Sequence, residues 1–251
     1  MVSTYAIAIR NGLELTPTRE IDRADYEALL RLNEELAFYR DFDRAWRILH
    51  VNLTRQKEIM MQLKAAFDDP SKYPELADGE LIQRALNVEL FNVLSASYFY
   101  FSEYSQTNIV RKYGKDSEAL SFLKATRSRY FDAYFEYRFF YKLRNYAVHC
   151  GLPIQIVRRV PIRRDGVAAE GFAIWFDCEM LLRSYDGWGR HVKNDLEGFD
   201  QLPVNSLVIN FANIVFSLQS ELDRYLRLAV RDSVESCHVI SADLDFESNT
   251  Y

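Results

Sequence analysis

Residues 22–69 decide the fold and read DRADYEALLRLNEELAFYRDFDRAWRILHVNLTRQKEIMMQLKAAFDD. No glycine or proline occurs from position 18 to position 69. Apolar side chains recur at spacings of three and four residues, which places them along one stripe of an α-helix. The stripe consists of Leu29, Leu32, Leu36, Tyr39, Trp46, Leu49, Leu53, Met60, Leu63 and Phe67. With Asp22 as N-cap and Pro70 beyond the end, the stretch predicts one long helix, straight or bent once.

The composition of the whole chain also favours helices. The 251 residues include only Gly 9 and Pro 6, whereas a chain of this length ordinarily carries about 30 of the two together. This shortage excludes collagen-like and low-complexity proteins, and it argues against a β-sandwich, which needs frequent turns. Apolar residues make up 49 % of the chain, enough for a sizeable core. We therefore expect a single, mainly α-helical domain spanning residues 1–251.

Three further helices are expected after the first one. Asp78 is the expected N-cap of the second helix, and Gly114 is expected to end it in a left-handed conformation. Gly151 and Pro153 stop the third helix. The predicted helices are 79–113, 116–150 and 203–230.

Two short β-hairpins are predicted from turn dipeptides between alternating apolar residues. Asn11-Gly12 predicts a hairpin at 4–15, and Asp165-Gly166 predicts one at 154–178. A loop rich in glycine and charge is expected at 184–202, and a flexible acidic tail at 232–251. The predicted fold is an up-and-down four-helix bundle with one hairpin before it and one inserted between the third and fourth helices.

Charge and cysteine content narrow the class of protein. The formal net charge is −5 and the pI is near 5.5, which is unlike a globally basic nucleic-acid-binding protein. Three cysteines without a C-x-x-C spacing, Cys150, Cys178 and Cys237, indicate reduced thiols rather than a disulfide framework or a zinc site. The N-terminus does not resemble a signal peptide, and no apolar run reaches the roughly 18 residues that span a bilayer. We expect a cytoplasmic protein with no membrane, metal or cofactor requirement.

One stretch near the end of the third predicted helix carries a candidate active site. Residues 141–153 read YKLRNYAVHCGLP, with Arg144, Asn145 and His149 close to the helix end. Five residues along an α-helix correspond to about 500° of rotation, or about 140° beyond a full turn. The Arg144 and His149 side chains can therefore converge only if the last turn opens, or if one of them comes from a second subunit.

This stretch resembles the Arg-x4–6-His motif of the HEPN superfamily, whose members are four-helix bundles and often dimers. The family motif usually has a polar residue directly after the arginine, and Asn145 matches it. The resemblance covers roughly residues 20–231 but neither hairpin. It implies a metal-independent endoribonuclease in which the motifs of two protomers meet. It also implies a role as a toxin or in phage defence, with an antitoxin protein as a partner.

The residue types suit RNA cleavage by the 2′-hydroxyl of the RNA itself. A histidine titrates near neutral pH, so His149 is the expected general base or acid. A guanidinium holds a phosphate with two parallel hydrogen bonds, so Arg144 is expected to stabilise the charge of the transition state. Asn145 is expected to position the histidine or a phosphate oxygen. The nucleophile belongs to the RNA, so the chemistry requires neither metal nor cofactor.

Other readings of these residues stay open. Arg44/His50 and Arg231/His238 match the same loose pattern, although neither pair has an asparagine after the arginine. A histidine in the last turn of a helix also interacts favourably with the helix dipole without any catalytic role.

Basic and aromatic residues surround the motif in the sequence. We expect these basic residues to bind RNA phosphates: Lys142, Arg158, Arg159, Arg163, Arg164 and Arg190. They could equally protect strand edges. The aromatic run at 98–104 is expected to be core or interface, and Trp188, between two glycines, is the better candidate for stacking on a base.

Three hypotheses follow from the sequence. The first is a dimeric HEPN-like endoribonuclease. The second is a non-catalytic HEPN-like module that binds nucleotide, RNA or a protein. The third is a structural helical protein in which Arg144 and His149 only form caps and ion pairs.

Overall fold

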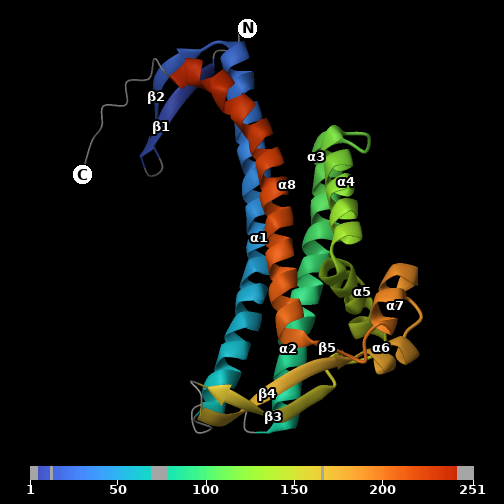
Figure 1. The fold of residues 1–251 in the computed structure, drawn as a ribbon. Coiled ribbons are helices and arrows are strands. Elements are labelled where there is room, and N and C mark those ends of the chain that lie inside the picture. The colour runs from blue at the N-terminus through green and yellow to red at the C-terminus, as the bar shows by residue number, and fades with distance from the viewer. Residues whose placement is uncertain (1–4, 12–13, 69–77, 165–166, 242–251) are drawn as a thin grey trace. The chain divides into compact units, whose positions relative to one another are not determined.

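The chain is mainly helical and carries small antiparallel sheets (Figure 1). The structure, a computed structural model, describes residues 5–11, 14–68, 78–164 and 167–241. The residues form two compact units, one made of 1–44 with 221–251 and the other of 45–220. The two longest helices, α1 (Arg23–Asp68) and α8 (Val204–Ser241), each contribute residues to both units. No helix in the described ranges is both long and apolar enough to cross a membrane.

The first unit contains the N-terminal hairpin. Strands β1 (Tyr5–Asn11) and β2 (Glu14–Ile21) pair antiparallel, with Tyr5 opposite Ile21. The hairpin predicted at 4–15 is therefore confirmed, but its second strand continues to Ile21. Its turn residue Gly12 lies outside the described residues.

The predicted first helix is confirmed with its bounds. The Asp22 carboxylate accepts a hydrogen bond from the backbone N–H of Asp25 at 2.8 Å, as expected of an N-cap. Within the second unit, Leu49, Leu53 and Leu63 of the apolar stripe are buried. The spacing of three and four residues thus identifies the side of α1 that faces the core.

The second predicted helix is one continuous helical segment with a wider turn in its middle. It consists of α2 (Gly79–Tyr98), a π-helical turn η3 (Phe99–Tyr104) and α3 (Ser105–Tyr113). The Ser105 hydroxyl donates to the Tyr100 carbonyl at 2.6 Å, which satisfies a backbone group in the wider turn. Gly114 has a positive φ of 93° but a ψ of 166°, so the left-handed helical cap that we expected is wrong.

The third predicted helix is interrupted, and the expectation of one helix over 116–150 is wrong. Helix α4 (Glu118–Ala133) and helix α5 (Phe135–His149) meet at Tyr134, which has extended dihedrals of φ −121° and ψ 118°. Neither glycine nor proline marks this break. A side chain from α5 supports it, because the Arg138 guanidinium donates to the carbonyl of Asp132 in the last turn of α4 at 3.3 Å.

The inserted hairpin is confirmed and belongs to a three-stranded sheet. Strands β3 (Ile156–Arg164), β4 (Val167–Asp177) and β5 (Gln201–Pro203) pair antiparallel in that order. The described strands of the two hairpins lie in separate sheets.

The segment predicted as a loop at 184–202 is largely ordered, so that prediction is wrong. After α6 (Cys178–Ser184) it contains α7 (Gly189–Glu197) and β5. Val192 and Leu196, four residues apart on α7, are both buried. This contact with the core stabilises a nine-residue helix that its polar composition does not favour.

Helix α8 differs from the predicted fourth helix at both ends. Pro203 ends β5 instead of opening the helix, and the helix continues to Ser241 rather than stopping near Val230. Of the predicted acidic tail at 232–251, residues 242–251 lie outside the described residues. The up-and-down order of four helices stays a prediction.

Candidate functional site at the end of helix α5

Arg144 lies half-buried in a crevice between α5 and α2. Its guanidinium carbon is 4.2 Å from the centroid of the Tyr98 ring, a cation–π contact between the two helices. Its Nη1 donates to the Asn145 side-chain oxygen at 3.2 Å, and its Nε is buried without a hydrogen-bond partner. No carboxylate pairs with Arg144 among the described residues. The arginine is therefore positioned by an aromatic ring and still has a free donor.

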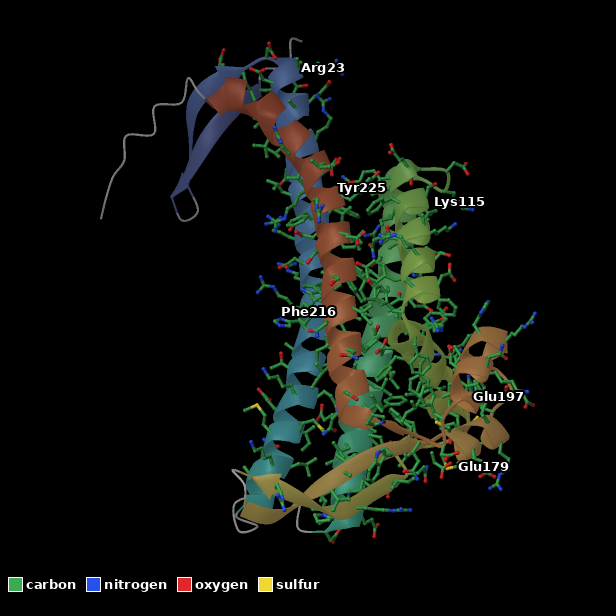
Figure 2. The ribbon with its side chains drawn as sticks, viewed as in Figure 1. Arg23, Lys115, Glu179, Glu197, Phe216 and Tyr225 are labelled. Carbon is green, nitrogen blue, oxygen red and sulfur yellow. The ribbon has the colours of Figure 1, made fainter. Side chains whose placement is uncertain are left out.

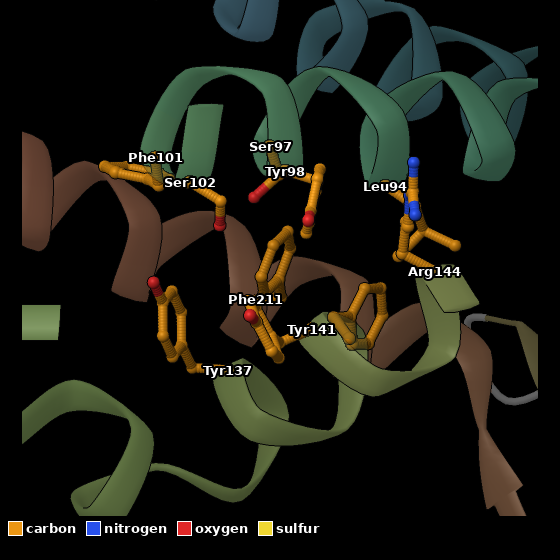
Figure 3. Close-up of a pocket in the computed structure, with 10 residues that line it drawn as sticks. Leu94, Ser97, Tyr98, Phe101, Ser102, Tyr137, Tyr141, Arg144 and Phe211 are labelled. Carbon is orange, nitrogen blue, oxygen red and sulfur yellow. The ribbon is translucent and has the colours of Figure 1, made fainter. Parts of the chain in front are cut away.

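The crevice around Arg144 is mostly aromatic (Figure 3). Tyr98 and Ser97 from α2, Tyr141 from α5 and Phe211 of α8 line it. These side chains nearly fill the space, because the crevice holds only about 10 Å³. These side chains hold the Arg144 guanidinium in one orientation.

His149 is the last residue of α5 and is exposed. The helix remains closed there, since the N–H of Cys150 donates to the Tyr146 carbonyl at 2.8 Å. Gly151 follows with a φ of 148°, a conformation that side chains other than glycine rarely adopt. Because the last turn does not open, Arg144 and His149 project in different directions from the helix, and no hydrogen bond joins them in the described structure.

The chain directly after His149 is anchored by Asn87 of α2. The Asn87 amide is fully buried, accepts from the Ile154 N–H at 2.9 Å and donates to the Ile154 carbonyl at 2.9 Å. The Gln83 side chain donates to the same carbonyl at 2.9 Å. These bonds fix the direction in which the chain leaves the motif. Sequence reasoning missed Asn87, because the role depends on a partner 67 residues away.

One of the six predicted RNA-binding residues, Lys142, lies beside the residue that precedes another of them, Arg190. The Lys142 Nζ lies 3.9 Å from the position that a Cβ would take at Gly189, so Lys142 reaches the start of α7, where Arg190 is exposed.

The two described basic side chains of β3 do not share a face. Arg158 and Arg163 are both exposed, but they are five residues apart in a pleated strand and so face opposite sides. Arg159 and Arg164 lie in the same strand, and their side chains are outside the described part of the structure.

Trp188 is a core residue, and its prediction as a base-stacking residue is wrong. Only 2 % of its surface is exposed. Its ring stacks on Phe139 and Tyr146 at centroid distances of 5.9 Å and 5.8 Å, and its indole N–H donates to the Leu181 carbonyl at 3.0 Å. The two flanking glycines suggested an exposed turn, but the Trp188 ring is buried because it packs against α5.

In the other two pairs that match the loose motif, Arg44 and His50 contact side chains outside the motif. Arg44 forms an exposed ion pair with Asp41 at 3.3 Å. His50 stacks on Trp46 and meets the edge of Phe216, a residue labelled in Figure 2. The side chain of His238 lies outside the described residues.

A second cavity in the same unit was missed by sequence reasoning. It holds about 290 Å³ and is lined by side chains of α4 and α5, namely Lys124, Arg127, Ser128, Phe131, Tyr137 and Tyr141. The α4 residues recur at spacings of three and four, so a search for polar helix faces could have found them. Burial raises the pKa of Tyr137, and the neighbouring Arg127 partly offsets this.

No cluster of three or more histidine, cysteine or acidic side chains suited to a metal ion occurs in the described part of the chain.

Comparison with known protein families, with curated proteins and with solved structures finds no match to this chain. The HEPN resemblance therefore rests on the motif and the helical plan alone.

Proposed function

We propose that this chain is a HEPN-like endoribonuclease that cuts RNA without a metal and acts as a homodimer. The observation that carries the proposal is the environment of the two motif side chains, Arg144 and His149, at the end of α5. Arg144 is oriented by Tyr98 and Asn145 with no carboxylate partner in the described structure, and His149 is exposed about 1.4 turns further on.

The reaction requires a base, an acid and a stabiliser of negative charge. The RNA 2′-oxygen attacks the adjacent phosphorus, the bond from phosphorus to the 5′-oxygen breaks, and a 2′,3′-cyclic phosphate and a 5′-hydroxyl end form. His149 takes the proton of the 2′-hydroxyl or delivers one to the leaving 5′-oxygen. Arg144 donates to the phosphoryl oxygens as their charge increases, and Asn145 orients the guanidinium.

The closed last turn of α5 favours a site shared by two protomers. Arg144 and His149 of one chain point about 140° apart, so one chain alone does not direct both at the same phosphate. Val148 and Leu152, on either side of His149, are 43 % and 53 % exposed. Apolar side chains exposed beside the histidine suit an interface with a second copy. Lys142 and Arg190 would then bind the flanking RNA phosphates.

The proposal is tested by incubating single-stranded RNA with the protein in the presence of EDTA. We expect cleavage with cyclic-phosphate ends, and a loss of about 100-fold or more in rate for Arg144→Ala and for His149→Ala. The matched control is Lys115→Ala, which removes an exposed charge in the turn between α3 and α4 (Figure 2). Intact RNA with the wild type, or unchanged cleavage by either motif variant, would refute the proposal.

A non-catalytic HEPN-like module that binds RNA or nucleotide is the second candidate. The half-buried position of Arg144 against the Tyr98 ring favours this binding module. A guanidinium held in one orientation can bind a phosphate without cleaving RNA. This candidate predicts salt-dependent RNA binding with no strand cleavage in the same assay. A role in phage defence, with an antitoxin as partner, follows only from the family resemblance.

A further inference from the structure

The cavity between α4 and α5 has an unusual set of polar groups. Its lining supplies two cations, Lys124 and Arg127, and three hydroxyl groups, those of Ser128, Tyr137 and Tyr141. Among the described residues, no carboxylate belongs to that lining. The nearby Asp132 carboxylate accepts a long bond of 3.5 Å from the exposed Ser128 hydroxyl.

Arg127 is the central residue of this cavity. Its Nη2 donates to the Ser102 hydroxyl at 3.0 Å, and its charge partly offsets the rise in the pKa of the buried Tyr137. Its Nε is buried and has no hydrogen-bond partner among the described residues. A guanidinium stays charged at every physiological pH, and a half-buried charge that meets only hydroxyl groups is costly.

Arg138 shows how the same fold treats an arginine that is purely structural. Its guanidinium pairs with the Asp195 carboxylate of α7 at 2.6 Å, and the two side chains are 16 % and 28 % exposed. Arg127 has no such counter-charge within the described residues. The contrast indicates that the anion for Arg127 comes from outside the protein.

We propose that this cavity binds a phosphate monoester, carried by a mononucleotide or by the 5′ end of an oligonucleotide. The Arg127 guanidinium and the Lys124 ammonium neutralise the phosphate, and the Ser128 hydroxyl rotates away from Asp132 to donate to it. Phe131 and Tyr141, which meet edge to face at 5.9 Å, provide an aromatic wall for the attached base. At about 290 Å³ the cavity is close to the lower limit of about 300 Å³ for small-molecule sites. The proposal stands whether or not the chain cuts RNA.

The test is calorimetric titration in EDTA with four ligands in two matched pairs. The first pair is AMP and adenosine. The second is a trideoxynucleotide with a 5′-phosphate and the same trideoxynucleotide with a 5′-hydroxyl, neither of which has the 2′-hydroxyl that cleavage needs. We expect the phosphorylated member to bind at least about tenfold more tightly in at least one pair. The pair that gives the larger difference identifies the source of the phosphate.

Three variants assign the binding to the cavity. Arg127→Gln should weaken the phosphorylated ligand by about tenfold or more, provided that its unfolding curve shows a folded protein. Ser128→Asp changes an exposed residue, so it should leave the fold intact while repelling the phosphate. Its matched control is Ser121→Asp, which adds the same charge at an exposed position of α4 outside the lining.

Two results would overturn the proposal. One is equal affinity for the phosphorylated and unphosphorylated members of both pairs. The other is a Ser128→Asp variant that binds as tightly as the Ser121→Asp control.

Discussion

Asn87 connects α2 to the chain that follows the motif. Replacing it with alanine removes the hydrogen bonds to both backbone groups of Ile154, and Ile154 is itself fully buried. An unsatisfied buried N–H costs about 1–3 kcal/mol, so we expect Asn87→Ala to lower the free energy of unfolding by about 2–4 kcal/mol in urea titration. The control Val88→Ala changes a neighbour that is 51 % exposed and should cost less than about 0.5 kcal/mol. Equal losses for the two variants would contradict this role for Asn87.

Cys178 and Cys150 should differ in reactivity. Burial, with smaller contributions from Asp177 and Asp200, raises the pKa of the Cys178 thiol from 9.0 to about 11. Folding therefore favours the neutral thiol, and this stabilisation is present below pH 9 and is lost as the pH rises through about 11. At pH 8 we expect iodoacetamide to label the exposed Cys150 first and Cys178 only as the protein unfolds, as measured by peptide mass spectrometry. Equal labelling of both would show that Cys178 is accessible.

At the scale of single residues, spacing in the sequence predicted features that depend on adjacent residues and missed contacts between distant parts of the chain. The interval from Arg144 to His149 and the position of the helix end follow from adjacent residues, so the sequence was sufficient for them. The burial of Trp188 and the unpaired Nε of Arg127 depend on neighbouring helices. No local pattern encodes those contacts.

Among the elements, helix α2 depends on its N-cap. The Asp78 carboxylate accepts from the Leu81 N–H at 2.8 Å and lies at the positive end of the helix dipole. We expect Asp78→Ala to cost about 1 kcal/mol of unfolding free energy, and Asp78→Asn to cost only a few tenths because asparagine still provides an oxygen acceptor. Thermal or urea unfolding of the two variants measures the difference. An alanine variant as stable as the asparagine variant would mean that the cap does not support the helix.

Some helices and strands could be predicted from sequence patterns, and others could not. The bounds of α1 and the strands of the inserted hairpin were predicted, because stripes, caps and turn dipeptides are local. The break at Tyr134 and helix α7 were not predicted. Arg138 links these two features, since it donates to the last turn of α4 and pairs with Asp195 of α7. Arg138 and Asp195 are 57 positions apart, so their ion pair does not produce a periodic pattern in the sequence.

For the whole molecule, composition predicted a mainly helical chain but not its division into two compact units. The first unit joins the two ends of the chain, and Tyr39 donates a hydrogen bond to Asp223 within it, 184 residues away. Burial and the Asp223 carboxylate raise the pKa of Tyr39 to about 12. Contacts over such a separation follow from the paths of α1 and α8, which a helical stripe alone does not determine.

The proposed sharing of the active site by two protomers can be tested at the scale of the whole molecule. In a twofold dimer each site would combine Arg144 of one protomer with His149 of the other, so the two sites would be equivalent. A mixed dimer of Arg144→Ala and His149→Ala chains would then contain one site with both native residues and one site with neither. A site within a single chain would be defective in both halves of such a dimer.

The most direct measurement is therefore cleavage of single-stranded RNA in EDTA by the two variants, separately and after co-refolding in equal amounts. We expect cleavage by the wild type, cleavage slower by about 100-fold or more by either variant alone, and recovery of about a quarter of the wild-type rate in the mixture, because half of the dimers are mixed and each has one intact site. Intact RNA with the wild type, or variants that cut as fast as the wild type, would contradict the assignment of the ribonuclease site to Arg144 and His149. A mixture that stays inactive would contradict the shared site.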